Sequence, residues 1–172
     1  RKALGWPHAP FVIPDDILGD WRKAGQRSKE LRKAWDNKLA GLAPEVKSEF
    51  ERRINGVLPK ALAEAVKSVK ETLAKTPKDI ATRASSEFAL ESLVPAVPEM
   101  IGGSADLTGS NNTRTKSMKA IHASDFSGRF INYGIREHGM AAAMNGLALH
   151  GGVVPYGGTF LVFCGYARGA NR

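Results

Sequence analysis

The fold class is decided by the stretch RFINYGIREHGMAAAMNGLAL, which spans residues 129–149. Its first five residues, 129–133, are typical of a short strand, and a glycine follows them. From Arg136 to Leu149 the residues are mostly Ala, Met and Leu, which are good helix formers. The stretch therefore predicts a strand, a tight turn and a helix in immediate succession.

The flanking sequence repeats this alternation. Apolar runs ending in glycine or proline predict strands over 99–103 and 152–156, with a polar loop over 104–126 between the first two strands. Helices are predicted over 79–94 and from Thr159 toward Arg172. Alternating strands and helices favour a parallel α/β sheet. Since three strands are few for such a sheet, we expect an incomplete domain.

Residues 1–78 have a different character. The prolines among residues 1–19 favour a loop. One helix face is then formed by residues at three- and four-residue steps, all but Ser28 apolar: Trp21, Ala24, Ser28, Leu31, Trp35, Leu39 and Leu42. Helices are also predicted over 44–55 and 58–73. We interpret these stripes as packing surfaces rather than as a cofactor site. The sequence thus predicts a helical N-terminal arm, residues 1–78, before the sheet domain, residues 79–172.

Composition narrows the class of protein. The apolar fraction of 42% is normal for a globular protein, and no apolar run is long enough to cross a bilayer. A single cysteine, Cys164, excludes an internal disulfide and a cysteine-based zinc site. The net charge of +8 lies mostly on the helical arm, which also carries many acids, so we expect no nucleic-acid partner. Without a signal-peptide pattern, the expected compartment is the cytoplasm.

A run of small and polar residues follows the first predicted strand. It has the sequence GGSADLTGSNN, residues 102–112. Small residues at the carboxyl end of a parallel strand let a ligand approach the backbone, and Asp106 and Ser110 are the polar groups available there. The alternative is a surface turn made of ordinary turn-forming residues.

Glu137 falls in the first turn of the helix that follows the second strand. The helix dipole favours an ionised carboxylate at this position, whereas apolar surroundings favour the neutral acid. Opposing influences of this kind suit a group that carries a proton. The alternative is a first-turn glutamate that stabilises the helix and does nothing else.

Three aromatic residues follow at helical spacing, namely Phe160, Phe163 and Tyr166. On one helix they lie roughly on one face, where they could form a wall for a flat heteroaromatic ring. The alternative, which the pattern alone favours, is core packing.

Taken together, these segments resemble transketolase. The motifs are GGSADL at 102–107, GIREHGM at 134–140 and GGTFLVF at 157–163, with LGWPHAPF at 4–11, so that the resemblance spans essentially the whole chain. It implies the end of a diphosphate-binding domain, a helical connection and the start of a pyrimidine-type thiamine-diphosphate-binding domain. The implied activity is transfer of a two-carbon ketol unit from a ketose phosphate to an aldose phosphate in the pentose phosphate pathway.

The resemblance also implies a role for individual residues. Glu137 matches the glutamate that meets N1′ of the aminopyrimidine and so helps to activate the thiazolium carbon. Phe163 matches the aromatic that stacks on this ring, and Phe160 and Tyr166 line the same pocket. Residues lying beside the cofactor are matched by Asp106 and Leu107. Arg83 and Ser110 match ligands of the sugar phosphate, for which a guanidinium and a hydroxyl are suitable donors.

The resemblance further implies a homodimer with a shared cofactor site and a Mg²⁺ or Ca²⁺ ion. The chain has no Gly-Asp-Gly motif of the kind that holds diphosphate and metal in this family, so we expect no metal ligand here and an inactive isolated fragment. Gly165, Gly169 and Asn171 stand where the family usually has Asp, Pro and an apolar residue. Dihydroxyacetone synthase, or a non-catalytic binding or regulatory module with the same fold, remain alternatives.

Overall fold

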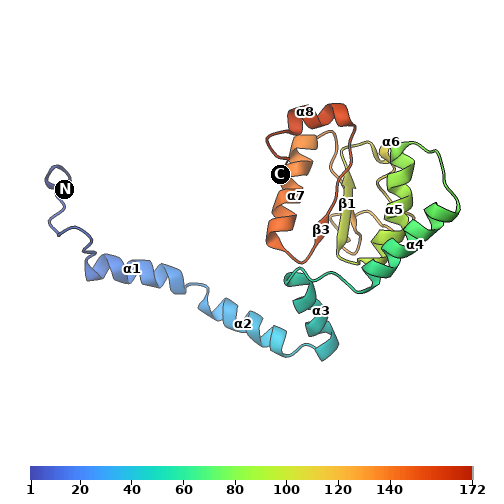
Figure 1. Cartoon of the computed structure of the whole chain (residues 1–172). Helices are drawn as coiled ribbons and strands as arrows, with labels where there is room; N and C mark the ends of the chain where they lie inside the picture. The colour runs from blue at the N-terminus through green and yellow to red at the C-terminus, as the bar shows by residue number, and fades with distance from the viewer. Residues whose placement is uncertain (172) are drawn as a thin grey trace. The chain divides into compact units, whose positions relative to one another are not determined.

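The computed structural model describes residues 1–171 and divides into two units, residues 1–47 and the part of the chain from Ser48 onward. Each unit is described by itself. The domain boundary predicted at residues 78/79 falls inside the second unit and stays a prediction. The predicted class, an α/β domain preceded by a helical arm, is confirmed (Figure 1).

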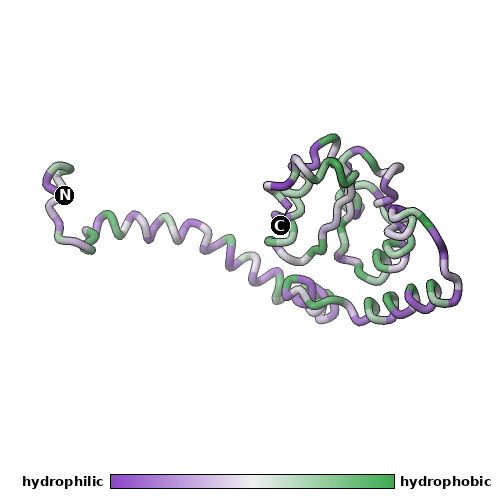
Figure 2. Tube along the Cα trace, turned by 45° about the horizontal axis from the view of Figure 1, so that its top comes forward, coloured by the Kyte–Doolittle hydropathy of each residue, from purple (hydrophilic) through white to green (hydrophobic). Residues whose placement is uncertain are grey.

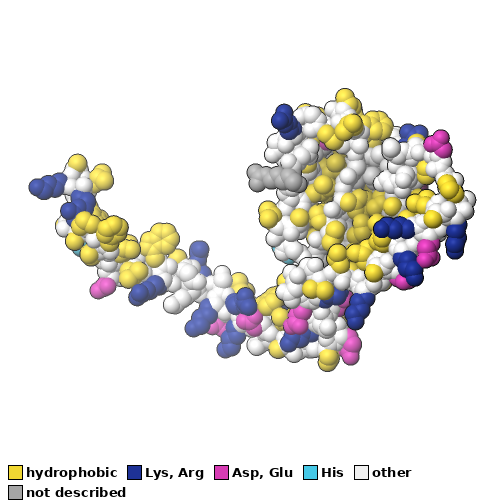
Figure 3. Space-filling view, viewed as in Figure 1, with side chains coloured by type: hydrophobic (Ala, Val, Ile, Leu, Met, Phe, Trp, Pro, Cys, Tyr) yellow, Lys and Arg dark blue, Asp and Glu magenta, His cyan; other side chains and the backbone are white. Residues whose placement is uncertain are grey.

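The first unit contains a short 3-10 turn, Lys2–Leu4, and the helices α1 (Asp15–Gln26) and α2 (Lys29–Ala40). The expected continuous stripe over 21–42 is broken between the two helices. Gly25 and Ser28 flank the break, and both residue types are poor in helix interiors. Hydrophilic and hydrophobic residues alternate along both helices (Figure 2). Neither helix buries a residue, so the predicted packing surfaces are exposed among the described residues (Figure 3).

Three helices lead into the sheet. They are α3 (Pro44–Ile54), which begins in the first unit, then α4 (Ala61–Lys75) and α5 (Thr82–Ala96). Gly56 follows α3 with a φ of 68°, a left-handed conformation that glycine adopts without steric cost, so it ends the helix as predicted. α5 begins three residues later than the sequence predicts and contains Pro95 near its end.

The sheet has three parallel strands in the order β2-β1-β3. β1 (Met100–Ser104) is central, and Gly102 aligns with the first residue of β2 (Phe130–Asn132). On the other side Met100 aligns with the first residue of β3 (Val154–Pro155). The predicted strand positions hold, but β2 and β3 are shorter than expected. The loop predicted over 104–126 contains one helical turn, α6 (Thr108–Asn111), which the sequence analysis missed.

The core of the second unit lies beneath β1 and β2. Val94, Met118 and Phe130 are buried together, and Tyr156 packs against them. A Cβ atom built on Gly102 would lie 2.3 Å from Cζ of Tyr156, so β1 needs glycine there for the tyrosine ring to pack. Gly102, which the sequence analysis placed in a ligand-binding segment, is therefore also required for packing.

The long helix α7 (Glu137–His150) lies across the sheet from α5 in Figure 1. The helix predicted from Thr159 is wrong in extent, because the chain forms a 3-10 turn, Leu161–Phe163, and the four-residue helix α8 (Cys164–Ala167). Glycines at 165 and 169 disfavour a longer helix. Asn171 is exposed rather than directed into a core, and the expected end at Arg172 lies outside the described residues.

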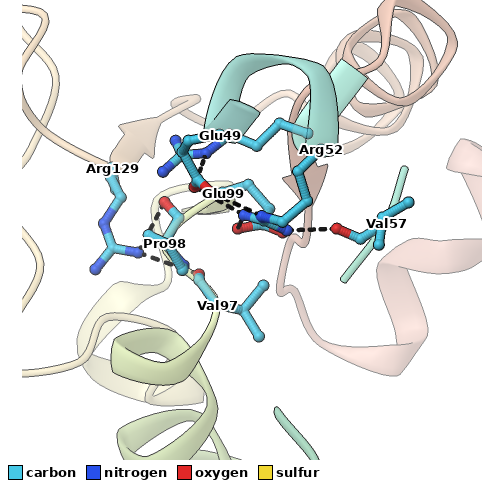
Figure 4. A network of polar contacts seen from close by, with 8 residues as sticks. Glu49, Arg52, Val57, Val97, Pro98, Glu99 and Arg129 are labelled. Carbon is cyan, nitrogen blue, oxygen red and sulfur yellow. Dashed lines mark hydrogen bonds and ion pairs between the residues drawn. The ribbon is translucent and has the colours of Figure 1, made fainter. Parts of the chain in front are cut away.

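An ion-pair network around the buried Glu99 carboxyl lies at the amino-terminal end of the sheet (Figure 4). Glu99, directly before β1, is 4% exposed and receives two hydrogen bonds from the Arg52 guanidinium of α3, at 2.8 and 3.0 Å. Arg52 also bonds Glu49 and the carbonyl oxygen of Val57. These charge-assisted bonds lower the pKa of Glu99, and they lower the pKa of Glu49 to about 2 with help from Arg53.

Candidate active site

Glu137 is the most deeply buried acid near the carboxyl end of the sheet. It is the first residue of α7 and is 2% exposed. The strand β2, then Gly134 with a φ of 70°, turn the chain so that this side chain points inward. The position in the first helical turn agrees with the sequence prediction. A buried carboxyl requires hydrogen-bond donors, and two hydroxyls supply them.

The two hydroxyls come from the segment after β3. Thr159 Oγ1 donates to Glu137 Oε1 over 2.9 Å, and the Tyr166 hydroxyl donates to Glu137 Oε2. The same tyrosine oxygen accepts a hydrogen bond from the backbone N–H of Glu137 over 3.0 Å. Both carboxyl oxygens are therefore satisfied within the chain, and the carboxyl has a defined orientation.

A cavity of about 240 Å³ opens beside this carboxyl, and we name it the carboxylate cavity. Apart from two acidic groups and one phenol, its walls are apolar. The lining residues are Ala105, Asp106, Leu107, Ile135, Glu137, Phe163 and Tyr166. Five of these, including Glu137 and Phe163, are residues that the sequence analysis selected, whereas Ala105 and Ile135 were missed. Ile135 could have been suspected only from its place between Gly134 and Glu137.

Ser104, the last residue of β1, organises the loop between the strands. Its side chain is buried, and its Oγ donates to the carbonyl oxygen of Gly158 while accepting from the backbone N–H of Leu107. The Asn111 side chain donates to the same oxygen over 3.1 Å. Asp106 adopts a φ of 62°, which Asp reaches more readily than most residues. One serine thus holds the loop that carries Asp106 and Leu107.

A second cavity, of about 500 Å³, lies on the other side of this loop, and we name it the arginine cavity. Arg83 at the start of α5 and Ser110 of α6 both line it, although they are 27 residues apart in sequence. Its other lining residues include Ser86, Asn111, Thr113, Tyr156, Gly158, Thr159 and Phe160. The cavity combines one exposed guanidinium with several hydroxyls, which is a suitable donor set for a phosphate.

Phe160 and Thr159 differ from the sequence expectation. Phe160 lines the arginine cavity rather than the carboxylate cavity, and its ring stacks on that of Phe163 with centroids 6.2 Å apart. Phe160 precedes the 3-10 turn and Phe163 is its last residue, so the expected single face of an α-helix is absent. Thr159, where a helix was predicted to begin, donates a hydrogen bond to Glu137. The two residues of that contact are 22 positions apart in the sequence, and no local sequence pattern predicts it.

A neighbouring histidine and potential metal ligands are the remaining groups to compare with this geometry. His138 follows Glu137 but is exposed, with its Nδ1 3.4 Å from the carbonyl oxygen of Tyr166. Among residues 1–171 no group of three or more His, Cys, Asp and Glu side chains could hold a metal ion. Within the same residues no helix is both long and apolar enough to cross a membrane.

Comparison with known proteins identifies both parts of the sequence. The family described as "Transketolase, pyrimidine binding domain" matches residues 78–172, and "Transketolase, thiamine diphosphate binding domain" matches residues 1–59. The transketolase of Rhodobacter capsulatus is 50% identical over the whole chain, and that of Sinorhizobium medicae is 48% identical. The chain spans only 26% and 24% of these relatives, respectively.

Solved structures agree with the sequence relatives. A mutant transketolase of Pichia stipitis in complex with fructose 6-phosphate superimposes with a TM-score of 0.81 at 36% identity, over 98% of this chain and 26% of that one. Transketolase from Campylobacter jejuni gives a TM-score of 0.71 at 29% identity, over 98% and 24%. The similarity therefore extends through both the arm and the sheet.

Proposed function

Because this chain belongs to the transketolase family, we propose that it supplies the pyrimidine-binding part of a thiamine-diphosphate-dependent transketolase. The observation that carries the proposal is the buried Glu137 carboxyl at the wall of the carboxylate cavity, which the apolar side chains of Leu107 and Phe163 also line. A flat, uncharged ring with one nitrogen able to meet a carboxyl is the ligand that this combination suits.

The size of the carboxylate cavity is consistent with one ring. Cavities that hold a whole small-molecule ligand are typically about 300–1,000 Å³, whereas this one is about 240 Å³. An aminopyrimidine ring fits such a volume, but the complete cofactor does not. The diphosphate and a Mg²⁺ or Ca²⁺ ion would then be held by residues outside this chain.

Thiamine diphosphate, when bound, supplies the electron sink for breaking and forming the carbon–carbon bonds of ketol transfer. Glu137 holds or accepts a proton at N1′ of the aminopyrimidine, a role suited to a carboxyl shielded from water. Phe163 supports one face of the ring, stiffened by its stack with Phe160. Leu107 and Asp106 border the ring, and the Tyr166 hydroxyl keeps the carboxyl satisfied until the ring arrives.

For the arginine cavity we propose the phosphate of a sugar substrate. Arg83 can present a planar guanidinium to two phosphate oxygens, and Ser110 adds a hydroxyl. The structural relative from Pichia stipitis was solved in complex with fructose 6-phosphate, which supports substrates of this class. The two cavities share one intervening segment, Gly157–Phe163, so a sugar in one would lie near a ring in the other.

The proposed assembly is a cytoplasmic homodimer in which a second copy completes the site. Exposed apolar side chains of residues that line, or directly follow residues that line, the two cavities support this idea. Ile135, Leu161 and Val162 are 78%, 87% and 76% exposed, respectively. Such a cluster of exposed apolar residues is typical of a surface that another protein covers.

A hybrid enzyme tests the proposal. The segment of Rhodobacter capsulatus transketolase that aligns with this chain is replaced by these 172 residues, since the two sequences align over the whole chain. We expect the hybrid to bind thiamine diphosphate and to transfer ketol units, and Glu137→Gln to lower kcat by about 10²–10⁴-fold. The 172-residue chain alone is expected to be inactive.

A folded hybrid that is inactive, or one whose activity survives Glu137→Gln, would contradict the proposal and favour a non-catalytic binding module. If the complete exchange does not fold, an exchange limited to residues 78–172, the span of the pyrimidine-binding family, gives the same readouts. Ser68→Ala, on the surface of α4, serves as the control substitution.

A further inference from the structure

The two hydroxyls on Glu137 approach it from different cavities. Tyr166 lines the carboxylate cavity, so its hydroxyl reaches Oε2 from the side on which a ligand would enter. Thr159 lines the arginine cavity and does not line the carboxylate cavity, so its hydroxyl reaches Oε1 from behind. A ring entering the carboxylate cavity therefore competes with the tyrosine and leaves the threonine contact intact.

The backbone that carries Thr159 is held firmly in place. The preceding residue, Gly158, forms a bridge with Ser104, and its N–H donates to the carbonyl oxygen of Gly103 over 3.1 Å. The Gly158 carbonyl oxygen in turn accepts from the buried hydroxyl of Ser104. A Cβ atom at position 158 would lie 2.1 Å from the Thr113 side chain, so no other residue fits there without a shift. The Thr159 hydroxyl is thus presented from the edge of the sheet.

We propose that Thr159 is a positioning residue that holds Oε1 of Glu137, so that Oε2 faces the nitrogen of the bound ring. This inference rests on the proposed role of Glu137 and adds a residue to it. The threonine keeps its own proton, and the proton shared with the ligand moves only at Oε2. Without the hydroxyl, the carboxyl can rotate, and the fraction of molecules with the productive orientation falls.

The test uses the hybrid enzyme with Thr159→Val, Thr159→Ser and the control Thr72→Val. Thr72 is a surface threonine of α4 whose hydroxyl donates to the carbonyl oxygen of Ser68 one turn earlier. Two readouts accompany kcat, namely the dissociation constant of thiamine diphosphate by calorimetry and the rate of hydrogen–deuterium exchange at the thiazolium C2. Thermal unfolding checks that each variant is folded.

We expect Thr159→Val to slow C2 exchange and kcat by about 10-fold or more, the effect of losing one hydrogen bond to a charged group. Thr159→Ser should restore most of the rate, because it keeps the hydroxyl, and Thr72→Val should change neither rate. The dissociation constant should change much less than the rate, because the ring still meets the carboxyl. In the double variant with Glu137→Gln, Thr159→Val should add no further loss, since it acts through Glu137.

The outcomes separate the two proposals. Normal C2 exchange in Thr159→Val, with Glu137→Gln impaired, overturns the positioning role and leaves the proposed function standing. Equal losses in the Val and Ser variants also overturn it, because the hydroxyl would then not be the cause. Unimpaired Glu137→Gln overturns the proposed function itself. If the Val variant does not fold, Thr159→Ala, which also lacks the hydroxyl, is measured instead.

Discussion

Tyr166 and Glu137 are joined by two hydrogen bonds that use one oxygen atom. The phenol donates to Oε2 of the carboxyl and accepts from the backbone N–H of the same glutamate. The contact ties α8 to the first turn of α7, one of the helix ends whose N–H groups lack a partner within the helix. It satisfies a buried carboxyl and a helix amino terminus at the same time.

Removing this phenol should destabilise the chain. Tyr166→Phe leaves the N–H of Glu137 and one carboxyl oxygen without their partner, so we expect a loss of about 1–3 kcal/mol in the free energy of unfolding. Urea denaturation of the 172-residue chain measures the change. Tyr133→Phe, which removes a phenol outside this contact, is the matched control. Equal stability of the two variants would show that the Tyr166 contact does not hold α8.

The proposed phosphate site in the arginine cavity predicts that KM depends on the charge of the substrate. In the hybrid enzyme, Arg83→Leu should raise KM for a sugar phosphate by about 10–100-fold, as expected for the loss of a charge-assisted pair. KM for the corresponding unphosphorylated sugar should change little, because that substrate has no anion for the guanidinium. Ser110→Ala should act in the same direction with a smaller effect.

The comparison of the two sugars is the decisive measurement. A parallel rise in both KM values would mean that Arg83 stabilises the cavity instead of binding phosphate. The dissociation constant of thiamine diphosphate, measured in the same variants, should stay unchanged because the carboxylate cavity does not include Arg83.

Local sequence was sufficient to predict the placement of Glu137 but not that of its partners. The strand, Gly134 and the helix start at Glu137 are consecutive, so short-range rules determine where the carboxyl lies. The Thr159 contact depends on the bridge between Gly158 and β1, which is a tertiary feature with no periodicity to detect. The long helix predicted from Thr159 does not form, because Gly165 and Gly169 disfavour a helix more strongly than the spacing of the aromatic residues favours one.

A glycine in the central strand offers a test of packing. Gly102→Ala places a Cβ atom 2.3 Å from Cζ of Tyr156, whose ring lies against the core. Overpacking of this kind costs about 1–3 kcal/mol in stability. Gly146→Ala is the matched control, since nothing lies within 4 Å of its added Cβ in α7. It should stabilise the chain by about 0.5–1 kcal/mol.

Thermal denaturation of both variants shows whether each substitution lowers or raises the stability of the chain. Two glycine-to-alanine changes with opposite effects would separate a steric requirement from a general preference for alanine. A stabilising Gly102→Ala would mean that the Tyr156 ring moves aside freely and that the strand glycine has no packing role.

The network around Arg52 predicts acid sensitivity. Because Arg52 lowers the pKa of Glu49 from 4.5 to about 2, and also lowers that of Glu99, the folded chain stays ionised where the unfolded chain takes up protons. Stability should therefore be fully present above about pH 4.5 and fall as the pH decreases toward 2. Denaturation curves between pH 2 and 7 would display this loss.

Arg52→Met should make that pH dependence flatter and lower the stability at pH 7 by about 3 kcal/mol, since Glu99 is left buried without its cation. Lys23→Met removes an exposed pair with Asp20 instead, and should change stability little. An unaltered acid transition in Arg52→Met would assign the acid sensitivity to other carboxyl groups.

The last prediction concerns the proposed partner copy. Ile135 lines the carboxylate cavity and Leu161 lines the arginine cavity, and their exposed side chains are proposed to be covered in the dimer. In the hybrid enzyme, Leu161→Arg should weaken the dimer, because a buried charge without a partner is costly, and should raise the cofactor concentration needed for half-maximal activity. Sedimentation equilibrium and cofactor titration provide the two measurements.

Leu149→Arg is the matched control, because Leu149 is 88% exposed and lies at the far end of α7 from Glu137. The loss of dimer in Leu161→Arg but not in Leu149→Arg would place the partner over the segment between the two cavities that carries Leu161. If Leu161→Arg remains a dimer with normal cofactor affinity, the surface that covers the cavity excludes Leu161, and the proposed partner contact at this site is wrong.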